Sequence, residues 1–223
     1  MSDILLERQL DYFKRSKYRS AVHFATKACV IPKVKFIDSY VPLKGASILD
    51  LGCGNGAYTD ELVNYTEKVV GLDVSRQMLL RNPVNKLIEG NVESLPIKDS
   101  SFDIVFAANL LHHANNHSSI INEMKRVSKR YVVIIEPNCI NPIVFLYFLL
   151  VKEERGGLKS TKRKLWQLLE NSDLSILKIA VTGMISQNNT PAFLIPYLKR
   201  FDKEISLGEF IILVAEKKNV RLL

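Results

Sequence analysis

The stretch Ile48-Leu49-Asp50-Leu51-Gly52-Cys53-Gly54-Asn55-Gly56-Ala57 decides the fold class, because it has the pattern of an apolar strand that runs into a glycine-rich turn and then a helix. Glycine is needed in such a turn when a ligand lies against the backbone, since a side chain would hold the ligand away. The spacing of Gly52, Gly54 and Ala57 is also that of a dinucleotide-binding turn. The turn could therefore bind either a dinucleotide or a ligand without phosphate. Asp50 favours the second interpretation, because a carboxylate at the end of the strand would repel a pyrophosphate.

A second carboxylate follows the next apolar run. Residues 69–72 are followed by Asp73, where an acidic side chain can accept hydrogen bonds from both hydroxyls of a ribose. Two carboxylates at successive strand ends therefore indicate a phosphate-free nucleoside that carries a positively charged tail. The alternative is that Asp50 and Asp73 only cap the helices that follow them.

The chain around this stretch alternates short apolar runs with helical segments, which predicts an α/β fold with a doubly wound, mostly parallel sheet. Residues 3–40 have a helical pattern, and we expect Pro32 to separate two of the helices there. Beyond residue 138 we expect an apolar helix, a basic linker, a further helix and two closing strands. The predicted regions of this single domain are an N-terminal helical cap (1–42), a ligand-binding core (43–138), an insertion or lid that includes the sixth strand (139–204), and a closing strand with its tail (205–223).

Segments along the core resemble those of the class I S-adenosylmethionine-dependent methyltransferases, especially the type-11 subgroup. The matching segments, in order, are Asp50-Leu51-Gly52-Cys53-Gly54-Asn55-Gly56, Gly71-Leu72-Asp73-Val74-Ser75 with Met78, Gly90-Asn91-Val92-Glu93-Ser94-Leu95-Pro96, Ser101-Phe102-Asp103-Ile104-Val105, Leu110-Leu111-His112-His113 and Ile135-Glu136-Pro137. The resemblance implies a Rossmann-like seven-stranded sheet with an antiparallel last strand. It also implies S-adenosyl-L-methionine as cofactor and S-adenosyl-L-homocysteine as product.

The resemblance assigns the cofactor-binding positions residue by residue. The implied set is Asp50, Gly52, Cys53 and Gly54 around the methionine end, Asp73 at the ribose, Val74, Met78, Asn91 and Val92 around the adenine, and Asn109 and Leu110 closing over the methionine end. The chain departs from the family at Asn91, which is usually aspartate, and at Val92, which is usually alanine. The amide oxygen of Asn91 can still accept a hydrogen bond from the adenine amino group, so we expect weaker adenine recognition.

Methyl transfer needs alignment of the acceptor and exclusion of water, and a general base only where the acceptor must lose a proton. His113 is the first candidate for that base and His112 the second, with orientation of the loop as the structural alternative. Glu136, at the end of the fifth strand, is predicted either to position the acceptor or to bind loop amides. Cys53 is expected to be a packing residue, and no metal site is predicted from the three cysteines.

The identity of the acceptor should depend on the helical cap and the insertion. The apolar run 143–151 is followed by a basic stretch. We interpret it first as a buried core helix, with an apolar lid or an interfacial segment for a lipid-like acceptor as the alternatives. The predicted function is therefore methylation of a small-molecule or lipid-like acceptor, with transfer to oxygen favoured. RNA methylation and a noncatalytic cofactor-binding subunit are the alternatives.

Composition and charge limit the class of protein and the kinds of partner that the sequence allows. The chain of 223 residues is 47% hydrophobic and 24% charged, as expected of an ordinary globular domain. Its 31 basic and 23 acidic residues give a formal charge of +8, which favours an acidic partner such as nucleic acid, an anionic lipid surface or a charged small molecule. The N-terminus lacks the pattern of a secretory signal, and the longest apolar run of nine residues is far shorter than the roughly 20 of a membrane-spanning helix. We therefore expect a cytoplasmic protein whose membrane contact, if any, is peripheral.

Overall fold

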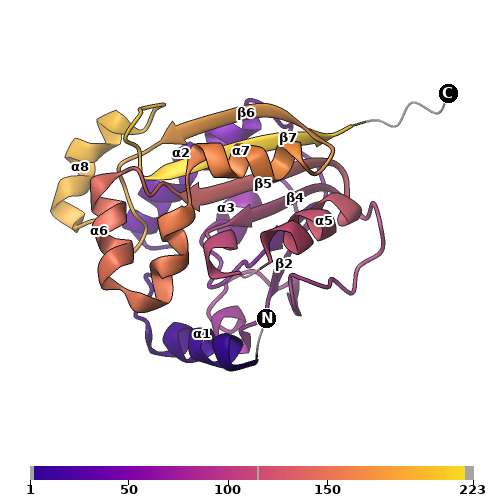
Figure 1. Cartoon of the computed structure of the whole chain (residues 1–223), viewed down its shortest axis with the longest axis horizontal. Coiled ribbons are helices and arrows are strands. Elements are labelled where there is room, and N and C mark those ends of the chain that lie inside the picture. The colour runs from indigo at the N-terminus through magenta and orange to yellow at the C-terminus, as the bar shows by residue number, and fades with distance from the viewer. Residues whose placement is uncertain (1–2, 115, 219–223) are drawn as a thin grey trace.

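The computed structural model describes residues 3–114 and 116–218 and shows a seven-stranded sheet between two layers of helices (Figure 1). The strand order is β3-β2-β1-β4-β5-β7-β6. The strands are β1 (Ile48–Leu51), β2 (Val69–Asp73), β3 (Leu87–Glu89), β4 (Phe102–Ala108), β5 (Ser128–Pro137), β6 (Leu174–Thr182) and β7 (Phe210–Lys217). β7 is antiparallel to both of its neighbours, β5 and β6, and the pairs among β1 to β5 are parallel. The predicted doubly wound sheet with an antiparallel last strand is confirmed.

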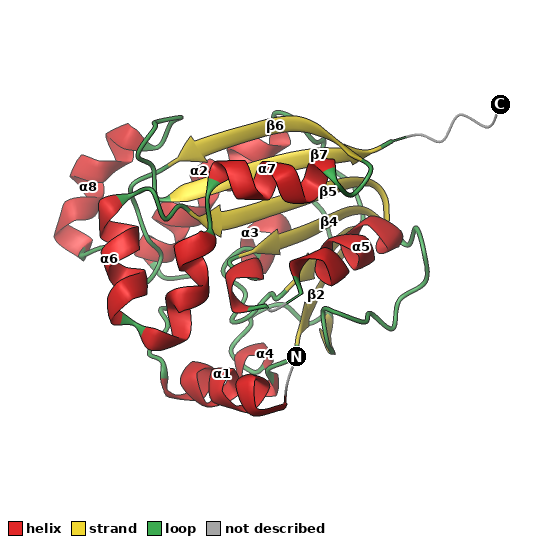
Figure 2. Ribbon diagram, in the orientation of Figure 1, coloured by secondary structure: helices red, strands yellow, loops and turns green. Residues whose placement is uncertain are grey.

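Helices cover both faces of the sheet, as the colouring by secondary structure shows (Figure 2). The α-helices are α1 (Asp3–Arg15), α2 (Phe24–Asp38), α3 (Thr59–Leu62), α4 (Arg76–Leu79), α5 (His117–Val127), α6 (Pro142–Leu150), α7 (Lys162–Glu170) and α8 (Ile195–Leu198). The 3-10 helices are η1 (Leu111–His113), η2 (Lys152–Lys159), η3 (Ala192–Leu194) and η4 (Lys199–Phe201).

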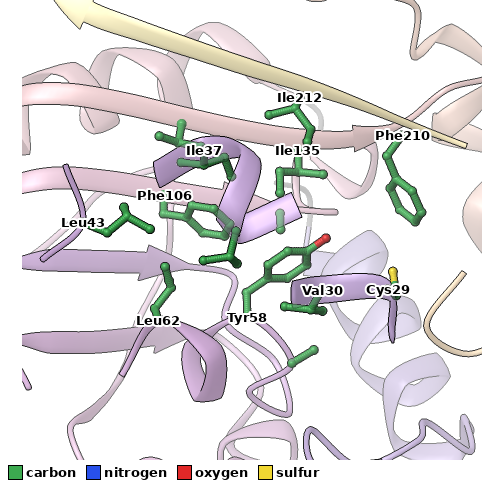
Figure 3. Close-up of a cluster of buried hydrophobic side chains, with 14 of the residues drawn as sticks. Cys29, Val30, Ile37, Leu43, Tyr58, Leu62, Phe106, Ile135, Phe210 and Ile212 are labelled. Carbon is green, nitrogen blue, oxygen red and sulfur yellow. The ribbon is translucent and has the colours of Figure 1, made fainter. Parts of the chain in front are cut away.

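The core consists of two apolar clusters, one on each face of the sheet. Strand side chains alternate between the faces, so that Val133 and Ile135 of β5 join one cluster while Val132 and Ile134 join the other. The first cluster packs under α2 and α3, and Figure 3 shows the ring of Phe106 within it. The second packs under α5 and α7. Burial on both faces explains why the central parts of the parallel strands, such as residues 104–108 and 131–135, are continuous apolar runs.

The expectation that Pro32 separates two helices is wrong, because α2 continues through it. Proline inside a helix costs about 3 kcal/mol, since it lacks the N–H that would bond to the preceding turn. The same helix buries Val30, Val34 and Ile37 completely. Burial of each such side chain contributes about 1.5–3 kcal/mol, which offsets the cost of the proline.

The interpretation of residues 143–151 as a buried core helix is also wrong. α6 begins after Asn141, whose side-chain oxygen accepts hydrogen bonds from the N–H groups of Ile143 and Val144. Phe148 is the only buried side chain of this helix, while Ile143 is 66% exposed and Leu150 is 74% exposed. α6 is therefore an apolar helix with most of its surface uncovered.

Within the described residues, no helix is both long and apolar enough to cross a membrane. The end of the predicted C-terminal tail, residues 219–223, lies outside the part of the chain that the structure describes.

Candidate active site

A cavity of about 640 Å³ lies at the carboxyl ends of β1, β2 and β4. The strand order turns from decreasing to increasing numbers between β1 and β4, which is where ligands bind in open α/β sheets. The eleven residues assigned to the cofactor by resemblance all line this cavity: Asp50, Gly52, Cys53, Gly54, Asp73, Val74, Met78, Asn91, Val92, Asn109 and Leu110. Side chains of α1 and α6 and residues 184–191 contribute the remaining walls.

The glycine-rich turn after β1 has a backbone that ordinary residues would strain. Gly52 has φ +67° and Gly54 has φ +51°, both in the left-handed region. A Cβ on Gly52 would lie 2.8 Å from Cδ1 of Leu110. The turn therefore brings its backbone close to the opposite wall of the cavity. Cys53 packs against Gly71, and burial raises the pKa of its thiol, so the expectation of a packing residue agrees with its surroundings.

Asp73, the last residue of β2, holds two loops together. Its carboxylate oxygens accept hydrogen bonds from the N–H groups of Gly54 and Ser75, each at 2.8 Å. Ser75, and not Asp73, is the N-cap of α4. Each carboxylate oxygen has a second lone pair, so Asp73 can still accept hydrogen bonds from a ligand in the cavity. Burial raises the pKa of Asp73 above its ordinary value.

Asp50 is buried and accepts a hydrogen bond from the hydroxyl of Thr59 at 2.7 Å. Burial raises its pKa to about 7; the Thr59 bond opposes this shift and the charge of Asp73 adds to it. Within residues 3–114 and 116–218, neither Asp50 nor Asp73 forms an ion pair. Two neighbouring carboxylates, one buried and one partly buried, without a cation are electrostatically suited to a positively charged ligand, so the residues present fit the ammonium and ribose groups of S-adenosylmethionine.

The four residues that the resemblance assigns to the adenine, Val74, Met78, Asn91 and Val92, line the cavity. The side-chain oxygen of Asn91 accepts a hydrogen bond from the N–H of Glu93 at 2.9 Å, which leaves this oxygen one further lone pair. Asparagine in place of the family's usual aspartate at position 91 is therefore compatible with adenine binding, although one of the two lone pairs of its side-chain oxygen is already used.

The opposite end of the cavity contains His112 and His113 in η1. Burial and, to a smaller extent, the charge of His112 lower the pKa of His113 to about 4, so His113 is neutral at pH 7. Burial also opposes the charged form of His112, but the carboxylates of Glu136 and Glu154 outweigh this effect and raise its pKa. The first candidate for a general base is therefore a weak base, and the second is already protonated.

Glu136 lies behind the histidines and does not line this cavity. Its carboxylate accepts hydrogen bonds from the backbone N–H groups of Leu110 and Leu111, each at 2.8 Å, and contacts Nδ1 of His112 at 2.7 Å. Burial opposes ionisation of Glu136, while the charge of His112 lowers its pKa. These contacts favour the second interpretation of Glu136, in which it binds loop amides and positions other residues.

Two carboxylates in the cavity wall were missed by sequence reasoning. Glu154 of η2 lies 3.2 Å from Nε2 of His112 and 3.7 Å from Nε2 of His113. Glu209 precedes β7, and burial raises its pKa to about 7. Both come from the segments after residue 138, where motif spacing gives no signal. The Gly156-Gly157 pair was the available clue, because a Cβ on Gly156 would clash with the carbonyl oxygen of His112.

The fold and the site together define the class. A sheet of this strand order, with a glycine-rich turn after β1 and a carboxylate at the end of β2, is the arrangement of a Rossmann-like methyltransferase. Residues 49–135 match the family model described as a methyltransferase domain. Over these residues the chain is similar to the type-11 group of class I S-adenosylmethionine-dependent methyltransferases, a family whose cofactor is S-adenosylmethionine and whose product is S-adenosylhomocysteine.

Similar proteins include enzymes that act on quinone precursors. The chain is 35% identical over 149 residues to a demethylmenaquinone methyltransferase from Lactococcus lactis, a match that covers 58% of this chain and 59% of that relative. It is 32% identical over 98 residues to a ubiquinone biosynthesis O-methyltransferase from Nitrosococcus oceani, covering 40% and 42% of the two chains. The chain thus spans about three fifths of the length of the first of these relatives.

Solved structures share the fold. A SAM-dependent methyltransferase from Thermotoga maritima superposes with a TM-score of 0.70 at 15% identity, covering 96% of this chain and 99% of that one. This likeness extends beyond residues 49–135 to the helical cap and the insertion, and it concerns the fold alone.

Proposed function

We propose that this protein transfers the methyl group of S-adenosylmethionine to a small-molecule or lipid-like acceptor, with an oxygen nucleophile favoured. The observation that carries the proposal is the pair of carboxylates of Asp50, which is buried, and Asp73, which is partly buried. They face one cavity from adjacent strands without a cationic partner among the described residues. Asp50 would bind the ammonium group and Asp73 the ribose hydroxyls. Val74 and Met78 would contact the adenine ring.

The sulfonium of the cofactor supplies the activated methyl group. The protein must then hold the nucleophile in line with that methyl group and keep water out. His113 lies in the acceptor half of the cavity, where its neutral ring can accept a hydrogen bond from an acceptor hydroxyl. Its low pKa makes it an orienting group more than a strong base.

The acceptor half of the cavity has apolar walls. Ile143 and Val144 of α6 line it from one side, and Leu194 and Leu198 line it from the η3–α8 segment. An apolar wall favours an acceptor molecule that has an apolar part, such as an aromatic ring or an alkyl chain. One of the similar proteins is named as an O-methyltransferase of ubiquinone biosynthesis, which supports transfer to an oxygen atom.

The outer surface of these segments supports access from a membrane. We define the apolar surface as the exposed side chains of Ile143, Leu146, Leu150, Phe193 and Tyr197. It is flanked by exposed basic side chains, namely Lys152, Arg155, Lys199, Arg200 and Lys203. Apolar side chains bordered by lysine and arginine suit the interface of an anionic lipid layer. A cytoplasmic protein could thus take a lipid-like acceptor from the membrane surface.

Calorimetry tests the cofactor part of the proposal. Wild-type protein should bind S-adenosylmethionine and S-adenosylhomocysteine in the micromolar range, and Asp73→Ala should weaken both by tenfold or more, about 1.4 kcal/mol. Leu177→Ala, on the exposed part of β6, is a control that should bind as wild type does. Absence of binding would refute the methyltransferase proposal.

Transfer of a labelled methyl group tests the acceptor. The panel should contain phenols with and without an alkyl tail, a membrane lipid extract, and RNA. We expect turnover that rises with tail length. Turnover on RNA with strongly salt-dependent affinity would support the RNA alternative instead. Cofactor binding without turnover on any of these acceptors would favour the noncatalytic subunit.

A further inference from the structure

Three side chains in the acceptor half of the cavity converge on one point. One ring nitrogen of His112, one ring nitrogen of His113 and a carboxylate oxygen of Glu154 all lie within 4.8 Å of one another. Glu154 Oε2 is 3.2 Å from Nε2 of His112 and 3.7 Å from Nε2 of His113. All three residues line the cavity. Two imidazoles and one carboxylate that meet at a cavity wall are a chemically coherent set of metal ligands.

The spacing of these atoms agrees with a small divalent cation between them. Metal–ligand bonds of about 2.0–2.2 Å at tetrahedral angles place neighbouring ligand atoms about 3.3–3.6 Å apart. The two separations from Glu154, 3.2 and 3.7 Å, each lie about 0.1 Å outside this range, and the two histidines are at most 4.8 Å apart. Side-chain shifts of about 1 Å or less would therefore close the three ligands around an ion.

The ligand side chains are held in place by a second layer of contacts. Nδ1 of His112 contacts Glu136 at 2.7 Å, so its Nε2 is the nitrogen directed to the cluster. The other carboxylate oxygen of Glu154 accepts a hydrogen bond from the hydroxyl of Tyr12 at 2.9 Å. The ring of His113 packs edge-on against Phe13, with centroids 5.2 Å apart. A carboxylate behind a ligating histidine is a frequent feature of metal sites, because it fixes the orientation of the ring.

The backbone brings Glu154 to the histidines in a specific way. A Cβ on Gly156 would clash with the carbonyl oxygen of His112, and one on Gly157 would clash with the ring of Phe148. Gly156 therefore allows η2 to lie directly against η1, and Gly157 allows it to lie against α6. Glu154, two residues before Gly156, is carried into the cavity wall by this close contact.

The charges of the cluster also favour a divalent cation. Glu136 and Glu154 are both buried, and within the described residues neither pairs with a lysine or an arginine. Two neutral histidines and a divalent ion would balance both carboxylates, which reduces the cost of burying them.

We propose that His112, His113 and Glu154 bind one divalent transition-metal ion, with an open coordination position that faces the acceptor half of the cavity. Three protein ligands and one free position are the usual arrangement of a catalytic rather than a structural site. The role of the ion rests on the proposed function: with the ion bound, the acceptor's hydroxyl oxygen would lie on the metal in place of a hydrogen bond to His113. The ion would lower the pKa of that hydroxyl, its proton would pass to water, and the oxygen would then attack the methyl group.

Metal binding can be measured without any turnover. Protein freed of metal by a chelator and exchanged into chelator-free buffer at pH 8 is titrated with Zn²⁺ by calorimetry, and with Co²⁺ by visible absorption. We expect one ion per chain with a micromolar or lower Kd. Glu154→Gln and His113→Asn should each weaken binding at least tenfold. His117→Asn, a histidine of the adjacent helix α5 that is not in the cluster, should bind as wild type does.

The outcomes separate this proposal from the proposed function. No stoichiometric binding of either ion, or equal binding by wild type, Glu154→Gln and His113→Asn, overturns the metal site. Thermal unfolding of each variant checks that a loss of binding does not reflect a loss of folding. Binding of S-adenosylmethionine depends on Asp50 and Asp73, so protein that binds Zn²⁺ but no cofactor refutes the proposed function alone. A shift of the Co²⁺ absorption on addition of a phenol is expected if the open position receives the acceptor, and an unchanged spectrum refutes that role.

Discussion

Replacing Asp50 with asparagine should stabilise the cofactor-free protein and weaken cofactor binding at the same time. Asp50 is only 2% exposed, and its pKa of about 7 in the folded protein compares with an ordinary value of about 4. The difference of about 3 units, at 1.36 kcal/mol per unit, corresponds to about 4 kcal/mol of native-state destabilisation at pH 8. Asparagine has nearly the same shape and retains an oxygen that can accept the hydrogen bond from Thr59.

The sign of the pH dependence follows from proton binding. The folded protein binds a proton at Asp50 more tightly than the unfolded chain does, so the contribution of this residue to stability falls as pH rises from about 4 to about 7 and is constant above that. The stability difference between Asp50→Asn and wild type should therefore be near zero at pH 4 and reach up to about 4 kcal/mol at pH 8. Urea unfolding at these two pH values measures it.

Cofactor binding should change in the opposite direction. A hydrogen bond to a charged group contributes about 1.5–3 kcal/mol, so Asp50→Asn should weaken the binding of S-adenosylmethionine by about 10- to 100-fold in calorimetry at pH 8. A variant that is less stable than wild type at pH 8 and binds the cofactor equally well would refute the reasoning, because Asp50 would then be a structural residue.

Three further predictions concern other parts of the molecule. Gly52→Ala should weaken cofactor binding in calorimetry by more than tenfold, because a Cβ there would lie 2.8 Å from the side chain of Leu110 in a left-handed backbone; equal binding would show that the turn does not contact the ligand. Phe148→Ala should lower the free energy of unfolding in urea by about 3–5 kcal/mol, since this ring is fully buried. A change below about 1 kcal/mol would show that neighbouring side chains move in and fill the space left by the ring. Wild-type protein should co-sediment with phosphatidylglycerol vesicles, and Leu150→Ser should do so less. The control Leu80→Ser changes an exposed leucine at the C-terminal end of α4 and should sediment as wild type does. Equal sedimentation of the two variants would argue against membrane binding by the apolar surface.

The core of the fold could be predicted from local patterns, because each strand of a buried parallel sheet is an apolar run and the glycine-rich turn has a fixed place after β1. The positions of Asp50 and Asp73 at the cavity follow from the same rule, since the carboxyl ends of parallel strands share one edge. Pro32 was misjudged because burial of the surrounding apolar residues outweighs a local backbone preference.

The acceptor half could not be predicted in the same way. Whether the apolar helix α6 is covered depends on which segments pack on it, and its sequence is equally apolar on all sides. Glu154 meets His112 only through the close approach of Gly156 to the backbone of η1, which is a tertiary contact between segments about 40 residues apart. Sequence spacing carries no information on such a contact until the fold is known.

The single carboxylate of Glu136 links the two halves of the site. It accepts hydrogen bonds from the successive N–H groups of Leu110, Leu111 and His112, so the wall beside the methionine end and the wall beside the acceptor are parts of one rigid turn. A cofactor that displaces Leu110 therefore also displaces His112. The coupling free energy between two ligands is reciprocal, so an acceptor that binds more tightly after the cofactor must increase the affinity for the cofactor by the same factor. Release of S-adenosylhomocysteine would then depend in part on when the methylated acceptor leaves.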